Sequence, residues 1–221
     1  MTLNQVMAQL EKWGSEKACE LYKRHGAGDQ QFGVNRSNLR NLAKQIKTNH
    51  ELALELWGTE NIDAMLLATL LMRPKNLSQS DIEEMIASCE FYQLVDWFVV
   101  NVVKAVSFKD KLRTEWSARR DEYTGRAGWS LQTDHVKKGN ASSEELASLL
   151  DTIESRMKAA PYRMQETMNF CLGEIGIRHA DLRKRCIQIG EKLGVFKDYP
   201  TPKGCTSPYV PEWIAAVVSR K

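Results

Sequence analysis

The segment from Phe91 to Val106, FYQLVDWFVVNVVKAV, constrains the fold of this chain more than any other stretch. Its β-branched residues are typical of a strand, but its apolar side chains recur at intervals of three and four residues, the spacing of one helical face. They are Phe91, Leu94, Val95, Phe98, Val99, Val102, Val103 and Val106. Strict alternation of apolar and polar residues is absent, so the segment is predicted to be helical.

Signals for helix ends recur along the rest of the chain, and no segment has the pattern of a hairpin or a βαβ unit. Capping boxes are predicted over residues 80–83 and 142–145, each with a serine at the start and a glutamate three positions later. Stops are expected at Gly58, Arg73-Pro74, Gly139-Asn140 and Gly194. About eleven or twelve helices with short connections follow from these signals.

The predicted helices fall into pairs, and this pairing indicates the architecture. Second helices are expected to begin near Asn61, Phe91, Asp121 and Pro161, so that units of about 30–40 residues follow one another. Because one pair cannot bury its own apolar face, stacking of pairs is favoured. We predict an all-α chain of helical-pair repeats stacked into a curved solenoid, a single domain over residues 1–221; an irregular helical bundle is the alternative.

The end of the chain has a different character. Four prolines, at positions 200, 202, 208 and 211, predict an extended strap over residues 199–212. A short helix over residues 213–219 is expected to follow, anchored by Trp213 and Ile214.

Composition excludes several classes of protein. Five cysteines without a CxxC pair predict reduced thiols, and the four scattered histidines lack metal-ligand spacing, so no metal or other cofactor is expected. A nucleophilic role for Cys171 or Cys205 has no specific support in the pattern. No apolar run is long enough for a membrane span and no basic-then-apolar signal opens the sequence, so a cytoplasmic protein without a membrane partner is expected. The chain is also expected to be a monomer.

The charge is unevenly distributed along the chain, although the formal net charge is only +3. Residues 51–103 carry 2 basic and 9 acidic side chains, whereas the segments on both sides are net basic. A polyanion would be attracted to the flanks and repelled by the middle, unless the acidic side chains lie on the first helices of the pairs. The alternative is that all these charges are solvated helix faces.

Candidate site residues lie on the predicted second helices. Asp96 falls at the border of its apolar stripe, one turn after Tyr92, and Arg126 on a later helix is its candidate ion-pair partner. The pair would serve either to place a carboxylate beside a developing cation or to bridge two repeats. Two aromatic residues, Trp129 and Phe170, lie off their stripes, where they would contact a sugar or base, or an adjacent helix pair. Lys137 and Lys138 would contact phosphates, or form a solvated helix end.

Several of these segments resemble the AlkD-like group of HEAT-like-repeat DNA glycosylases and DNA alkylation repair proteins. The resemblance is carried by QFGVNRSNLRNLAKQI, FYQLVDWFVVN, the RAGW segment, TMNFCLGEIGIRHADLRKRC and the ending GCTSPYVPEWI. It implies HEAT-like repeats, duplex DNA as the partner, and hydrolysis of the N-glycosidic bond of purines alkylated at N3 or N7.

The resemblance also implies a role for each matching residue. Asp96 would stabilise the sugar cation as the catalytic residue, and Arg126 would bind a phosphate or orient Asp96. Tyr92 stands in place of the family's first tryptophan, Phe170 in place of its second, and Gly173 where an arginine contacts DNA. Tyr92, Trp129 and Phe170 would then contact deoxyribose. Because the leaving purine is cationic, an electrostatic stabiliser suffices without a cofactor.

Two other functions remain open on the same sequence. A helical-repeat protein with these substitutions would also fit a non-catalytic binder of DNA structures. A scaffold for a peptide or protein partner would fit the fold as well. The sign of charge on the helices that carry the site separates these functions, because DNA requires a positive surface.

Overall fold

A computed structural model describes residues 1–220 of the chain. Its described part holds thirteen α-helices and three short 3-10 turns and has no strand, so the predicted all-α class is confirmed. The α-helices are α1 (Leu3–Lys12), α2 (Glu16–Arg24), α3 (Arg36–Ile46), α4 (His50–Trp57), α5 (Ile62–Leu71), α6 (Gln79–Ala87), α7 (Tyr92–Asn101), α8 (Lys109–Ala118), α9 (Glu122–Lys137), α10 (Ser143–Arg156), α11 (Tyr162–Arg178), α12 (Arg183–Leu193) and α13 (Val210–Val218).

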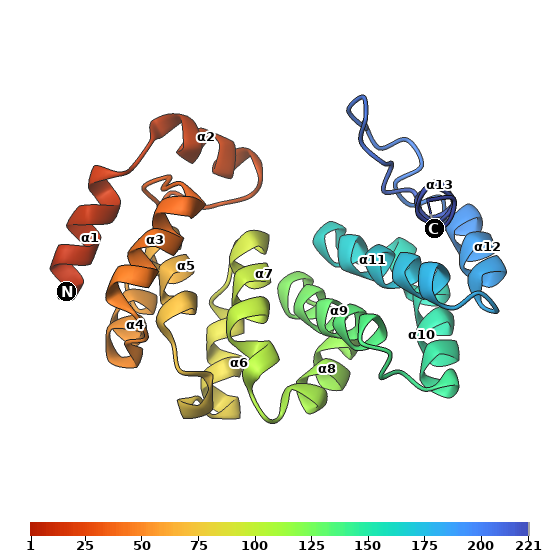
Figure 1. The fold of residues 1–221 in the computed structure, drawn as a ribbon, viewed down its shortest axis with the longest axis horizontal. Coiled ribbons are helices and arrows are strands. Elements are labelled where there is room, and N and C mark those ends of the chain that lie inside the picture. The colour runs from red at the N-terminus through yellow and green to blue at the C-terminus, as the bar shows by residue number, and fades with distance from the viewer. Residues whose placement is uncertain (221) are drawn as a thin grey trace. The chain divides into compact units, whose positions relative to one another are not determined.

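The contacts divide the chain into two compact units, Met1–Lys111 and the residues from Leu112 on. In the first unit α5 packs against α3, α4 and α7, and in the second α11 packs against α9, α12 and α13 (Figure 1). Each unit has its own buried helix: nine of the ten residues of α5 are buried, and ten of the seventeen of α11. That the whole chain is a single domain stays a prediction.

The predicted starts of the second helices are confirmed by the residues at the helix caps. Asn61, Phe91, Asp121 and Pro161 are the N-caps of α5, α7, α9 and α11. The Asn61 side chain accepts hydrogen bonds from two backbone N–H groups of the first turn of α5. Ser142 and Glu145 form the expected capping box of α10, and Gly194 ends α12 in the left-handed conformation with φ 63°.

Three local predictions are wrong. The capping box of α6 is formed by Ser78 and Asp81, two residues earlier than the predicted one. Helix α7 ends at Asn101 and a separate 3-10 turn carries Val103, so the apolar spacing continues past the end of the helix. Helix α13 begins at Val210 inside the predicted strap, because a proline at position 211 is favoured in the first turn of a helix.

Helix α13 is held against α11 and α12 by three glycines that permit close approach. A Cβ atom at Gly173 would lie 2.3 Å from the Trp213 ring, and one at Gly176 would lie 2.4 Å from Ile214. On α12, a Cβ atom at Gly190 would lie 2.9 Å from Pro211. The predicted anchoring of the last helix by Trp213 and Ile214 is thus seen in its contacts.

We expect Gly173→Ala to destabilise the protein by about 1–3 kcal/mol, because the added methyl group forces the Trp213 ring out of its position. The free energy of unfolding in urea measures the effect. Gly28→Ala is the control, since nothing lies within 4 Å of a Cβ atom at that position. Equal stability of the two variants would contradict this account of how α13 is held.

Among residues 1–220, no helix is both long enough and apolar enough to cross a membrane. The same residues contain no cluster of three or more metal-ligating side chains. Three of the five cysteines are buried, and burial raises the pKa of Cys171 to about 12, which disfavours a nucleophilic thiolate at that position.

Candidate nucleic-acid interface

Helix α7 presents one solvent-facing line of side chains. Tyr92, Asp96 and Val100 follow one another at intervals of four residues, and Val100 is 58% exposed. Asp96 is half-buried on this line, as its position at the border of the apolar stripe predicts. The carboxylate is therefore placed at the surface of the helix and not in its core.

Tyr92 belongs to a small aromatic cluster at the start of α7. Its ring contacts Phe91 at 5.4 Å and His25 at 6.5 Å between centroids, both edge to face. The phenol oxygen accepts a hydrogen bond of 2.9 Å from the Gln93 amide. These contacts fix the ring one turn before Asp96.

Arg126 is used within the second unit, where it joins α9 to α11. Its Nη1 lies 2.6 Å from a carboxylate oxygen of Glu166 and donates to the carbonyl oxygen of Arg163 at 2.8 Å. The residue is only 5% exposed, and its guanidinium shares the Glu166 carboxylate with that of Arg163. A phosphate contact by Arg126 stays a prediction that these contacts do not favour.

Trp129 is buried, so the prediction that it contacts a sugar or base is wrong and the alternative, contact with neighbouring helices, agrees with the structure. The residue is 1% exposed and belongs to the core of the second unit, with its indole N–H unpartnered. Helix α9 is covered on two sides: a Cβ atom at Gly128 would meet the backbone of α8 at 2.2 Å, and one at Gly125 would meet Met164 of α11 at 2.0 Å. A helix that is covered on two sides has no single apolar stripe. The position of Trp129 off the stripe therefore does not mean that the residue is exposed.

Phe170 is exposed, as its position off the α11 stripe predicts. It is 46% exposed and packs edge to face against Trp213, with 5.5 Å between ring centroids. The Trp213 ring also covers Gly173, the position where the resembled family carries an arginine. An arginine side chain at position 173 would clash with this indole. The glycine at this position is therefore what allows Trp213 of α13 to pack against α11.

Lys137 and Lys138 are about half-exposed at the end of α9. Lys137 lies 3.2 Å from Glu174, and Lys138 lies 2.7 Å from Asp134. Ion pairs at the surface contribute little, so they leave both amines accessible. Phosphate binding by these two lysines stays a prediction.

A row of cations along α3 is not among the predicted site residues. Arg36, Arg40 and Lys44 follow at intervals of four residues on one face of α3, and Lys47 is the C-cap residue directly after the helix, with φ 63°. Within the described part of the chain, none of the four has a carboxylate partner, and the last three are exposed. The spacing was visible in the sequence, inside a segment that carries the family resemblance. We call these four residues the α3 cation row.

Two members of the α3 cation row are held by α7. The Arg40 guanidinium lies 4.9 Å from the centre of the Trp97 ring and that of Arg36 lies 6.0 Å from it, both within the range of cation–π attraction. Arg36 also donates a hydrogen bond to the side-chain oxygen of Gln93. Trp97 follows Asp96 directly in α7. The helix that carries the candidate carboxylate therefore also contacts two residues of the α3 cation row.

A buried carboxylate fixes the loop that leads into α3. Asp63 on α5 is fully buried and accepts hydrogen bonds of 2.7, 2.9 and 3.0 Å from the backbone N–H groups of Phe32, Gly33 and Val34. Burial raises the pKa of this carboxyl, and the three N–H groups act in the opposite direction. The next residue, Asn35, is the N-cap of α3, so Asp63 sets where the cation row begins.

The acidic middle segment does not oppose a polyanion along the second helices. Five of its nine carboxylates lie on the first helices α4 and α6: Glu51, Glu55, Asp81, Glu83 and Glu84. On the second helices α5 and α7 only Asp63 and Asp96 are acidic, and Asp63 is buried. Within the first unit, most of the acidic side chains of residues 51–103 therefore lie on the first helices, as binding of a polyanion requires.

Comparison with known proteins identifies the class of fold to which this chain belongs. A solved structure described as a new family of proteins related to the HEAT-like repeat DNA glycosylases, with affinity for branched DNA structures, matches with a TM-score of 0.85. The sequences are 28% identical, and the match covers 100% of this chain and 95% of that one. The chain is therefore a HEAT-like repeat protein, as predicted.

The family follows from the sequence match. Residues 6–213 match the model of the DNA alkylation repair enzymes, so the chain belongs to that family. Uncharacterised proteins of Listeria innocua and Listeria monocytogenes are 22% and 21% identical to it, over 88% of this chain and 87% of each relative.

Proposed function

We propose that this protein binds branched DNA through its phosphate backbone. The observation that carries the proposal is the α3 cation row, three cations on one face of α3 and a fourth at its C-cap, without carboxylate partners in the described part of the chain. Lysine and arginine side chains in such a row neutralise phosphates and release condensed counterions. Their spacing along a rigid helix suits a regular array of phosphates.

The preference for a branch is supported by the relative with affinity for branched DNA structures, which this chain matches over its full length. It is also supported by the residues that depart from the glycosylase pattern. The burial of Trp129, the contacts of Arg126 with α11 and the indole over Gly173 each affect a residue to which the family resemblance assigns a contact with duplex DNA.

A competition experiment tests this function. Fluorescence anisotropy would compare a three-way DNA junction with a linear duplex of the same length and composition at one salt concentration. We expect the junction to bind more tightly. Equal binding of both DNAs would contradict the preference for branches, and binding of neither would contradict the function itself.

A second candidate function is hydrolysis of the N-glycosidic bond of alkylated purines, and the position of Asp96 favours it. The carboxylate stands on the solvent-facing line of α7 with the Tyr92 ring one turn before it. A fixed carboxylate at a surface that binds DNA would stabilise the cationic sugar as the alkylated base leaves.

For this second function, Asp96→Asn should lower the release of methylated bases from alkylated DNA by about 10²-fold, because the charge is lost while the shape is kept. DNA affinity and thermal stability should change little. If Asp96 is instead half of a buried ion pair between repeats, the substitution should cost about 3–5 kcal/mol of stability. A large loss of stability, in a protein that releases no alkylated base, would contradict the catalytic role.

A further inference from the structure

A pocket on the second unit, formed where the C-terminal strap crosses α11, is not explained by phosphate binding. Its volume is about 410 Å³, within the range of cavities that hold small organic ligands. Four aromatic side chains line it: Phe170 from α11, Trp213 from α13, Phe196 from the segment before the strap, and Tyr199 at the start of the strap. We call it the strap pocket.

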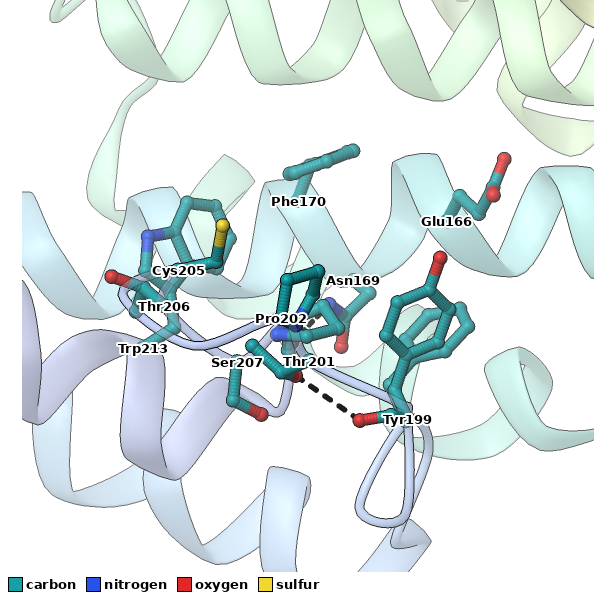
Figure 2. A pocket seen from close by; sticks show the side chains of 12 residues that line it. Glu166, Asn169, Phe170, Tyr199, Thr201, Pro202, Cys205, Thr206, Ser207 and Trp213 are labelled. Atoms are coloured by element: carbon teal, nitrogen blue, oxygen red, sulfur yellow. Dashed lines mark hydrogen bonds between the residues drawn. The ribbon is translucent and has the colours of Figure 1, made fainter.

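The rings of the strap pocket hold one another in place. Phe170 meets Trp213 with an interplanar angle of 87°, and Phe196 meets Tyr199 at 85°, with centroids 5.5 and 5.9 Å apart. Figure 2 shows Phe170 between the indole of Trp213 and the ring of Tyr199, above the strap. Phe170 and Tyr199 are both 46% exposed, so each offers an open ring face to a planar ligand.

Several polar groups lie in and around the strap pocket, among them the Glu166 carboxylate, which is ion-paired with Arg126 and Arg163. The hydroxyl groups of Thr201 and Ser207 line the wall, and Asn169 fixes the strap by donating to the Pro208 carbonyl at 2.8 Å. Lys197 and Lys203 directly follow the lining residues Phe196 and Pro202, and in the part of the chain that the structure describes neither has an ion pair. Aromatic faces beside accessible cations are the usual means of binding single-stranded nucleic acid.

We propose that the strap pocket takes one unpaired nucleobase of a branched DNA, held against the exposed rings of Phe170 and Tyr199, with Lys197 and Lys203 near its phosphates. The inference rests on the proposed binding of branched DNA and names the feature that would be recognised there. A base inside a duplex must lose its pairing and stacking to enter such a pocket, whereas an unpaired base at a branch point does not. The pocket therefore favours branched DNA over duplex DNA.

The test compares two three-way junctions, one with an unpaired adenine at the branch point and one with an abasic analogue at that position. We expect the wild-type protein to bind the adenine junction about tenfold more tightly, because stacking on aromatic side chains contributes that much per base. Phe170→Ala and Tyr199→Ala should each bring this ratio close to one. Leu54→Ala is the control and should preserve the ratio, since it shortens an exposed apolar side chain on α4 of the first unit, outside the strap pocket.

The binding of the abasic junction serves as an internal reference for every variant, so a general loss of DNA affinity cancels from the ratio. Quenching of 2-aminopurine placed at the unpaired position should accompany binding in the wild type and be lost in Phe170→Ala. Equal wild-type affinity for both junctions, or a ratio that persists in both variants, would overturn the strap pocket as a base site and leave the proposed function standing. Binding of neither junction would overturn both.

Discussion

Asp63→Ala should lower the free energy of unfolding by about 3 kcal/mol or more. The substitution leaves the backbone N–H groups of Phe32, Gly33 and Val34 without an acceptor, and the last two of these hydrogen bonds are buried. Each buried donor left without a partner costs about 1–3 kcal/mol, and hydrogen bonds to a charged acceptor lie at the high end. Urea denaturation monitored by circular dichroism measures the loss.

Asp29→Ala is the matched control for this substitution. Its side chain is 88% exposed and its ion pair with Lys23 lies at the surface. Such pairs contribute about 0–1 kcal/mol, so the control should unfold almost like the wild type. If Asp63→Ala were as stable as Asp29→Ala, the buried carboxylate would not be what fixes the loop before α3.

The second large effect is expected on DNA binding. The triple variant Arg40→Gln, Lys44→Gln, Lys47→Gln should bind a three-way junction about 10²- to 10³-fold more weakly at ~50 mM salt, because three phosphates are no longer neutralised. Arg36 is left in place, since it is half-buried and hydrogen-bonded to Gln93. The three substituted side chains are exposed, so thermal stability should change little.

A second triple variant separates position from net charge. Lys12→Gln, Lys17→Gln and Arg24→Gln remove the same two lysines and one arginine from α1 and α2, where cations alternate with Glu16 and Glu20. We expect a much smaller loss of affinity than for the α3 variant. An equal loss in both would show that net charge, and not the α3 cation row, governs binding.

What the sequence predicts best is the set of features that depend on neighbouring residues. The N-caps Asn61 and Asp121 were predicted because the capping side chain and the N–H groups it accepts from lie within four residues. The capping box of α6 was misplaced because Ser78 and Ser80 both offer a serine with an acidic residue three positions later. The capping pattern alone therefore fits two starting residues for α6, and it does not decide between them.

The features that the sequence does not reveal are those made by distant contacts. The hydrogen bonds of Asp63 join residues about 30 positions apart, so no local pattern marks that carboxylate. The sequence leaves two alternatives open for Trp129 because its burial depends on Gly125 and Gly128, which let two other helices approach α9. The strap pocket likewise depends on how residues 199–208 fold back over α11.

The α3 cation row is a different case, since its spacing is plain in the sequence and its meaning is not. A row of cations on a helix is most often a solvated face. What changes the interpretation is the lack of carboxylate partners in the described part of the chain, together with the Trp97 ring beneath Arg40. Both facts require the structure.

The salt dependence of junction binding tests the central claim most directly. If the four cations of the α3 row each neutralise one phosphate, the logarithm of the affinity should fall against the logarithm of salt concentration with a slope of about −3.6 or steeper. The α3 triple variant should have a slope less steep by about 2.7. A wild-type slope near zero, or one unchanged by the three substitutions, would contradict DNA binding through the α3 cation row.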